Sequence, residues 1–259
     1  MAKLVEAQLI KKEQLLPDIY RFTIDSFDIA TNAKPGQFLE IRVTEGTEPF
    51  LRRPISIHQV NPEQNTVSFI FQVKGKGTVL LAKKKEGDII DILGPLGYGT
   101  FQIQEKEKVA ILGGGIGVFP LYDLAKQLQQ KGNIVDIYLG YRSKEQVVLE
   151  NEFQKVASNL VITTDDGSYG TKGLAIACLK QHIHDYTMIY GCGPLPMLQA
   201  LQKTTKEEGI PCQISLEERM GCGIGACLGC AVKIVSGKQE RYGHVCKEGP
   251  VFFANDVEI

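Results

Sequence analysis

Four of the seven cysteines lie close together near the end of the chain, at a spacing that suits one kind of metal chemistry. Cys222, Cys227 and Cys230 follow the pattern Cys-x4-Cys-x2-Cys, and Cys246 completes the set. This is the plant-type spacing at which four thiolates hold the two irons of a [2Fe–2S] cluster. The pattern therefore predicts an iron–sulfur centre with these four cysteines as its metal ligands.

The residues between the cysteines are small, which fits a loop whose backbone N–H groups must approach sulfur closely. They include Gly221, Gly223, Gly225, Ala226 and Gly229. Structural zinc and inert thiols are the alternatives. Zinc favours paired Cys-x2–4-Cys knuckles, of which only one is clean here, and inert thiols have no reason to cluster. A Rieske centre needs two histidine ligands, and only His244 is near, so we expect His244 to be a surface residue.

A glycine-rich turn joins an apolar strand to a helical stretch in the middle of the chain. Its glycines are Gly113, Gly114, Gly115 and Gly117. Such a turn lets a pyrophosphate approach the backbone at a helix N-terminus. The full G-x-G-x-x-G pattern is not present, and glycine turns also serve helix–strand packing alone. Asp136, further on, fits a ribose hydroxyl or a solvated strand equally well.

A second turn, Cys192-Gly193-Pro194, ends another apolar strand and opens a helix at proline. Small residues at the edge of a nucleotide cleft leave room for a nicotinamide, which Cys192 could then touch. A buried small hydrophobic residue is the plainer interpretation of Cys192. The segment from Tyr141 to Ser143 follows a strand and could hold a 2′-phosphate, so the choice between NAD and NADP stays open.

A basic motif lies in the first third of the chain. Arg52 and Arg53 precede Pro54, Ile55 and Ser56 at the start of a predicted strand, and the later pair Gly77-Thr78 lies in a predicted turn before a short helix. An arginine fork, a hydroxyl and a helix N-terminus all bind phosphate. A solvated arginine pair and an ordinary helix cap explain the same residues.

The pattern of apolar residues divides the chain into three predicted domains: a β-barrel at 1–101, an α/β domain at 102–213 and a small cysteine-containing domain at 214–259. The first reads as short strands between turns, which indicates an antiparallel barrel or sandwich. The second alternates strands with helical stretches, which indicates a parallel sheet covered by helices. We expect helices at about 78–85, 118–131, 144–157, 173–183 and 195–208.

Composition excludes some classes of function. The net charge is −1, so no basic field is available for nucleic acid. No apolar run reaches the ~18 residues of a membrane span, and the first residues lack the core of a signal peptide. An odd number of cysteines is a poor disulfide framework. We therefore expect a cytoplasmic protein with neither nucleic-acid nor membrane partners.

Taken in order, these motifs resemble the ferredoxin–NADP reductase superfamily. Arg53-Pro-Ile-Ser56 is similar to its flavin motif, and the two glycine turns are similar to its nucleotide motifs. The cysteine pattern after Met220 narrows the resemblance to electron-transfer subunits of class 1B, NAD-dependent dihydroorotate dehydrogenase. This resemblance covers nearly the whole chain.

The resemblance implies FAD in the barrel, NAD in the second domain and [2Fe–2S] in the third. It implies flavin contacts from Arg53, Pro54, Ile55 and Ser56, from Ile70, Phe71 and Gln72, and from Gly77 and Thr78. An aromatic residue usually stands where Ile55 does. The resemblance also implies contacts with the nicotinamide cofactor from Gly113, Gly114, Gly115, Gly117, Cys192, Gly193 and Pro194.

The family further implies a partner, an FMN-containing catalytic subunit, in a heterotetramer of two plus two. Electrons then pass from dihydroorotate through the partner's FMN, the cluster and FAD to NAD+, in pyrimidine biosynthesis. No side chain of this chain is needed as a catalytic nucleophile or base. The alternative is a reductase subunit with the same parts that feeds a hydrogenase, an oxygenase or a ferredoxin, or, in a different class, a zinc-stapled nucleotide-binding module.

Overall fold

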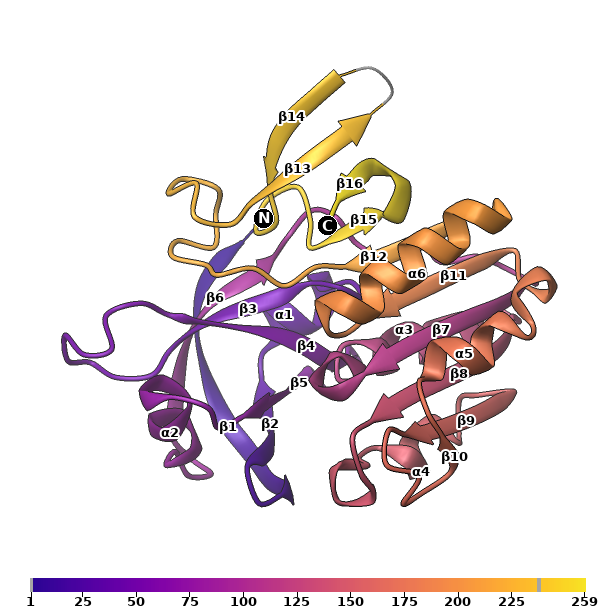
Figure 1. Cartoon of the computed structure of the whole chain (residues 1–259). Coiled ribbons are helices and arrows are strands. Elements are labelled where there is room, and N and C mark those ends of the chain that lie inside the picture. Colours follow the sequence, from indigo (N-terminus) through magenta and orange to yellow (C-terminus); the bar gives the residue numbers. More distant parts are fainter. Residues whose placement is uncertain (1, 237–238) are drawn as a thin grey trace. The chain divides into compact units, whose positions relative to one another are not determined.

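The computed structural model describes residues 2–236 and 239–259 (Figure 1). They form two compact units. The first comprises residues 1–100, 217–231 and 244–250, and the second comprises 101–216, 232–243 and 251–259. Residues 214–259 are thus shared between the units, and the three-domain division with boundaries at 101 and 213 stays a prediction. None of the described helices is long and apolar enough to cross a membrane.

Six antiparallel strands close into a barrel in the first unit, as the strand pattern predicted. The strand order around the barrel is β1-β2-β5-β4-β3-β6. The strands are β1 (Lys3–Leu16), β2 (Ile19–Asp25), β3 (Phe38–Arg42), β4 (Arg53–Asn61), β5 (Thr66–Gln72) and β6 (Ile89–Leu96). Closure removes the unpaired edges that an open sheet would expose.

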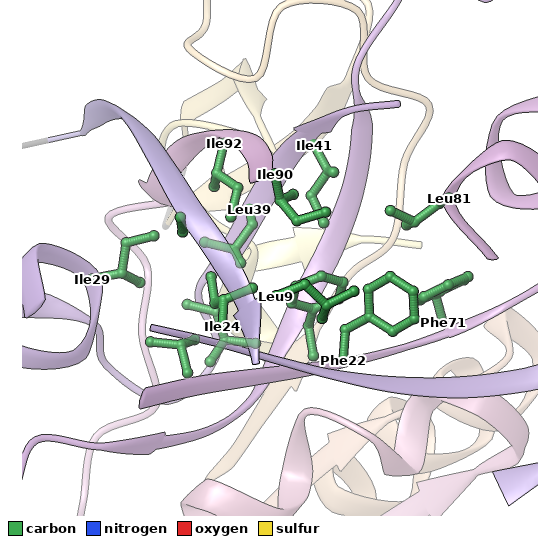
Figure 2. Close-up of a cluster of buried hydrophobic side chains, with 14 of the residues drawn as sticks. Leu9, Phe22, Ile24, Ile29, Leu39, Ile41, Phe71, Leu81, Ile90 and Ile92 are labelled. Atoms are coloured by element: carbon green, nitrogen blue, oxygen red, sulfur yellow. The ribbon is translucent and has the colours of Figure 1, made fainter. Parts of the chain in front are cut away.

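Alternate residues of these strands point inward and fill the barrel (Figure 2). Fully buried aliphatic and aromatic side chains contribute about 1.5–3 kcal/mol each. The core includes Leu9, Phe22, Ile24, Leu39, Ile41, Phe71, Ile90 and Ile92 from strands, with Ile29 and Leu81 from two short helices.

Those helices are α1 (Phe27–Asn32) and α2 (Lys76–Ala82). Ser26 caps α1, because its hydroxyl accepts the N–H of Ile29 at 3.4 Å. Helix α2 begins two residues before the expected 78–85, because the Thr78 hydroxyl accepts the N–H groups of Lys74 and Gly75 and closes the preceding turn.

The second unit is built on a seven-stranded sheet in the order β10-β9-β8-β7-β11-β12-β15. All neighbours are parallel except β15, which runs antiparallel to β12. The strands are β7 (Lys108–Gly114), β8 (Ile134–Tyr141), β9 (Asn159–Thr164), β10 (Thr171–Lys172), β11 (Met188–Cys192), β12 (Cys212–Ser215) and β15 (Val251–Phe253). A separate small sheet joins β14 (Gln239–His244), β13 (Ala231–Ser236) and β16 (Val257–Glu258).

The sheet helices are α3 (Leu121–Gln130), α4 (Glu150–Phe153), α5 (Ala175–Lys180) and α6 (Leu195–Glu208). Helix α3 packs beside α4, and α5 packs beside α6. Helix α6 has the predicted limits, and Gly209 ends it at φ 70°. The single helix expected at 144–157 is wrong: Leu149 at φ 65° divides it into a 3-10 turn and the short α4.

Hydroxyl groups and a carboxylate are buried near the amino ends of the central strands. Tyr186 Oη lies 2.7 Å from Tyr138 Oη and donates to Asp136 Oδ2 at 3.0 Å. Lys108 Nζ lies 3.7 Å from the same carboxylate. Burial raises the pKa of Tyr138, so the phenol stays neutral.

We predict that Tyr186→Phe destabilises the protein by about 1–3 kcal/mol, because the Asp136 carboxylate loses a buried donor. Urea unfolding followed by circular dichroism measures the change. Tyr98→Phe removes a hydroxyl from an exposed ring and serves as the control, with little effect expected. Equal stability of the two variants would contradict this account of the network.

Candidate functional site: a cysteine centre and two ligand-binding edges

Three backbone N–H groups of the cysteine loop point at one sulfur atom. The N–H groups of Ile224, Ala226 and Cys227 donate to Cys222 Sγ at 3.5, 3.2 and 3.4 Å. Bonds of this kind stabilise a thiolate, which is the form that binds metal. Burial acts against the charge, but the three donors prevail and hold the pKa of Cys222 at about 6.

The four thiols are arranged as two pairs. The Cys222 thiol is hydrogen-bonded to that of Cys227, and the Cys246 thiol to that of Cys230. The Cys246 N–H donates to Cys230 Sγ at 3.4 Å. Burial and the neighbouring Cys230 raise the pKa of Cys246 to about 12. The two pairs differ in exposure, since Cys230 and Cys246 are each 2% exposed whereas Cys227 lies at the surface.

Two pairs fit two irons better than one ion. Tetrahedral zinc needs four ligands around one centre, whereas a [2Fe–2S] cluster takes two thiolates at each iron. The residues present therefore fit the cluster, and the assignment of its four ligands remains our proposal.

Positive φ angles at two glycines shape the cysteine loop. Gly223 has φ 70° and Gly225 has φ 83°. A Cβ atom on Gly223 would lie 2.7 Å from Glu40 Cγ, and one on Gly225 would lie 2.7 Å from Lys247 Cδ. Side chains at these positions would be strained and would push the loop away from its neighbours.

Glu40, beneath this loop, is a site residue that the sequence analysis missed. It lies in β3, is 1% exposed, and neither carboxylate oxygen has a hydrogen-bond partner among the described residues. Burial raises its pKa to about 7, against the opposing charges of Arg52 and Arg53. The one available signal was a lone acidic residue inside the apolar run Gln37–Val43.

The barrel opens between β4 and β5 at the residues expected to hold a flavin. From Arg53 to Ser56, β4 pairs only with β3, and its pairing with β5 begins at Ile57. From Ile70 to Gln72, β5 pairs only with β2. The two facing edges thus present backbone groups that need partners, and a flat polar ring could supply them. This arrangement fits FAD.

The side chains around this opening differ in whether they are free to contact a ligand. Arg53 lies against the start of α2, where a Cβ atom on Gly77 would lie within 3.0 Å of its Cδ and Cζ. Arg53 and this helix start fit a phosphate. The hydroxyl of Thr78 is already engaged in capping. Phe71 points into the barrel core, so only its backbone faces the opening, and Ile55 packs partly against that core.

Both glycine turns of the second unit lie at the point where the strand order of the sheet reverses. From β7 the chain proceeds to β8 and β9 on one side and later to β11 and β12 on the other. Gly113 is paired with Cys192 across the β7–β11 ladder. Ligands of open α/β sheets bind in the crevice at the carboxyl ends of such strands. The turns therefore fit a dinucleotide.

The glycines are required by packing between the two turns. A Cβ atom on Gly117 would lie 2.5 Å from Gly193 Cα and 2.6 Å from Cys192 O. One on Gly114 would meet Met197 Sδ at 2.7 Å and Pro194 Cδ at 3.0 Å. Gly115 differs, because it has φ 53° and open space around its Cα. Gly115 is therefore the glycine of this turn that is free to meet a ligand.

Two further candidate residues, Cys192 and Asp136, have buried side chains. Cys192 is 1% exposed, which agrees with the plainer interpretation of a small buried residue. Asp136 pairs with Ala110, four residues before the turn at Gly114, and its carboxylate accepts the Tyr186 hydroxyl. It lies at the wrong end of β8 for a ribose. His244 is half-buried, and its backbone N–H donates to Glu248 Oε1 at 3.2 Å.

Two family descriptions match the chain. Residues 217–258 match the iron–sulfur cluster binding domain of dihydroorotate dehydrogenase B, and residues 111–203 match the oxidoreductase NAD-binding domain. The first match contains all four clustered cysteines, and the second contains both glycine turns.

Two relatives that match the chain over nearly its full length have the same name. The dihydroorotate dehydrogenase B (NAD(+)) electron transfer subunit of Desulforamulus reducens is 41% identical over 254 residues, 97% of each chain. The subunit of the same name from Fusobacterium nucleatum is 41% identical over 263 residues, 99% of each chain. The chain belongs to this family.

Solved structures share the fold of this electron-transfer subunit. A chain of the NADH-dependent reduced ferredoxin–NADP oxidoreductase aligns with a TM-score of 0.86 and 32% identity, over 100% of this chain and 91% of that one. Phthalate dioxygenase reductase aligns with a TM-score of 0.66 and 18% identity, over 91% and 88% of the two chains. At that identity the second alignment shows the fold alone.

We predict that Gly117→Ala abolishes NAD binding by the subunit, because the added methyl group meets the backbone of the Cys192–Pro194 turn. Isothermal titration with NAD measures the loss. Gly209→Asn at the end of α6 is the matched control, since asparagine tolerates positive φ and a Cβ atom there has open space around it. If Gly117→Ala bound NAD as tightly as the unchanged chain, the packing explanation would be wrong.

Proposed function

We propose that the chain is the electron-transfer subunit of an NAD-dependent dihydroorotate dehydrogenase, binding [2Fe–2S], FAD and NAD. The observation that carries the proposal is the two-pair arrangement of the four cysteines, inside a segment matching the iron–sulfur domain of that enzyme. Full-length identity to subunits of the same name supports it. The role belongs to pyrimidine biosynthesis, as the relatives' name implies.

The bound groups supply the redox chemistry. The cluster carries single electrons, NAD takes two electrons as hydride, and the flavin can transfer either one electron or two. The chain's own residues hold these groups in place. Cys222, Cys227, Cys230 and Cys246 ligate the irons, and the N–H groups around Cys222 stabilise the negative charge on sulfur. We assign the edges at 53–56 and 70–72, with Gly77 and Thr78, to FAD, and the turns at 113–117 and 192–194 to NAD.

A catalytic partner subunit must deliver the electrons, and we propose that it contains FMN and the dihydroorotate site. Ile224 and Leu228 of the cysteine loop are 53% and 62% exposed. Leu228 also has φ 60°, which costs energy for a branched side chain. An exposed, strained apolar residue beside the cluster suits burial against a partner. We propose a cytoplasmic heterotetramer of two plus two.

A second function has support from the ferredoxin–NADP oxidoreductase likeness. In that case the same parts would exchange electrons with a ferredoxin. The two functions differ in the electron donor, so NAD+ reduction by dihydroorotate, with the catalytic subunit added and omitted, distinguishes them. Reduction that requires the added subunit supports the proposal, and no reduction in either case refutes it.

We predict that Cys227→Ser leaves FAD bound but lowers dihydroorotate-dependent NAD+ reduction by about 100-fold or more, because an iron loses a ligand. Flavin absorbance and steady-state rates measured on the complex report the two effects. Cys178→Ser, which changes a thiol on α5, should behave like the unchanged chain. An undiminished rate in Cys227→Ser would count against transfer through the cysteine centre.

We predict that Leu228→Asp weakens binding to the catalytic subunit by about tenfold, because a buried apolar contact is replaced by a charge. Aspartate tolerates positive φ, so the loop keeps its shape and the visible spectrum stays the same. Surface plasmon resonance gives the affinity. Leu174→Asp, at a leucine that is 63% exposed, is the control. Equal affinities for both variants would place the partner elsewhere.

A further inference from the structure

The carboxylate of Glu40 is buried where an uncharged residue would fit at lower cost. Its neighbours in β3, Leu39 and Ile41, point into the barrel core, so the Glu40 side chain points to the opposite face of the strand, where Gly223 of the cysteine loop lies against it. Burying an ionisable group costs free energy unless hydrogen bonds or an opposite charge compensate it. Neither Oε1 nor Oε2 of Glu40 has such a bond among the described residues.

The two nearby arginines are directed to other groups. Arg52 Nη2 donates to Asp91 Oδ1 at 2.8 Å, and its Nη1 donates to the carbonyl oxygens of Glu40 and Asp91. Arg53 Nη1 donates to the carbonyl oxygen of Arg52. Neither guanidinium donates to the Glu40 carboxylate, whose two oxygens have no hydrogen-bond partner among the described residues.

The cysteine loop lies directly against this carboxyl group. A Cβ atom on Gly223 would be 3.0 Å from Glu40 Oε1, so the glycine allows the loop backbone to approach the acid. Glu40 and the adjacent Cys222 interact electrostatically as like charges. In a protein interior such an interaction is screened far less than at the surface.

We propose that the negative charge of Glu40 lowers the reduction potential of the [2Fe–2S] cluster at Cys222. The inference rests on the proposed cluster site. One-electron reduction adds negative charge to the cluster, and a nearby carboxylate opposes that addition. Its position on the barrel strand β3, and not in the cysteine loop itself, holds the charge at a constant place against Gly223, the residue after Cys222.

The test is a redox titration of the full-length chain with dithionite, followed by the electron paramagnetic resonance signal of the reduced cluster. It is run at an alkaline pH, so that carboxyl groups are ionised. Glu40→Gln keeps the shape and removes the charge. We expect its midpoint to rise by ~59 mV, equivalent to about tenfold in the equilibrium constant.

Two variants separate the charge from the fold. Glu40→Asp keeps the charge and should stay near the unchanged chain. Glu63→Gln removes a charge from an exposed turn between β4 and β5, and solvent screening should leave the midpoint unaltered. A Glu40→Gln midpoint equal to that of the unchanged chain overturns the inference, as does loss of the cluster in Glu40→Gln, since a potential-setting charge is not needed to hold iron. Absence of the signal in the unchanged chain instead refutes the proposed cluster itself.

Discussion

The convergence of backbone N–H groups on Cys222 Sγ is the constraint from which the rest of the site follows. Three donors reach one sulfur atom only if the chain turns tightly around it, and the turn requires the positive φ angles at Gly223 and Gly225. The same turn places Cys227 beside Cys222. A loop of larger residues would lose both the donors and the thiol pairing.

Each unit creates its ligand-binding region by interrupting a regular ladder. In the barrel, β4 and β5 separate before their ends, which leaves two backbone edges facing each other. In the sheet, the strand order reverses at β7, with β8 and β9 on one side and β11 and β12 on the other. Ligands of open α/β sheets bind at such a reversal.

The sequence predicted those features that depend on spacing and period. The four cysteines, the six barrel strands and α6 are local patterns, and each is read from neighbouring residues. The broken helix near Leu149 was not predicted, because helical propensity does not reveal a single left-handed residue. The glycines at 114 and 117 were identified, but their reason is packing against a turn some 75 residues later, which no local pattern contains. Glu40 was missed for the same reason: its importance comes from a loop distant in the chain.

The route of the chain through the two units has a practical consequence. After the sheet strand β12, the polypeptide returns to the barrel unit at 217, leaves it at 232, re-enters at 244 and leaves again at 251. The barrel unit is therefore assembled from three separate segments, and no single cut of the polypeptide separates it from the sheet unit. A piece that ended at residue 100 would contain every barrel strand but none of the four clustered cysteines.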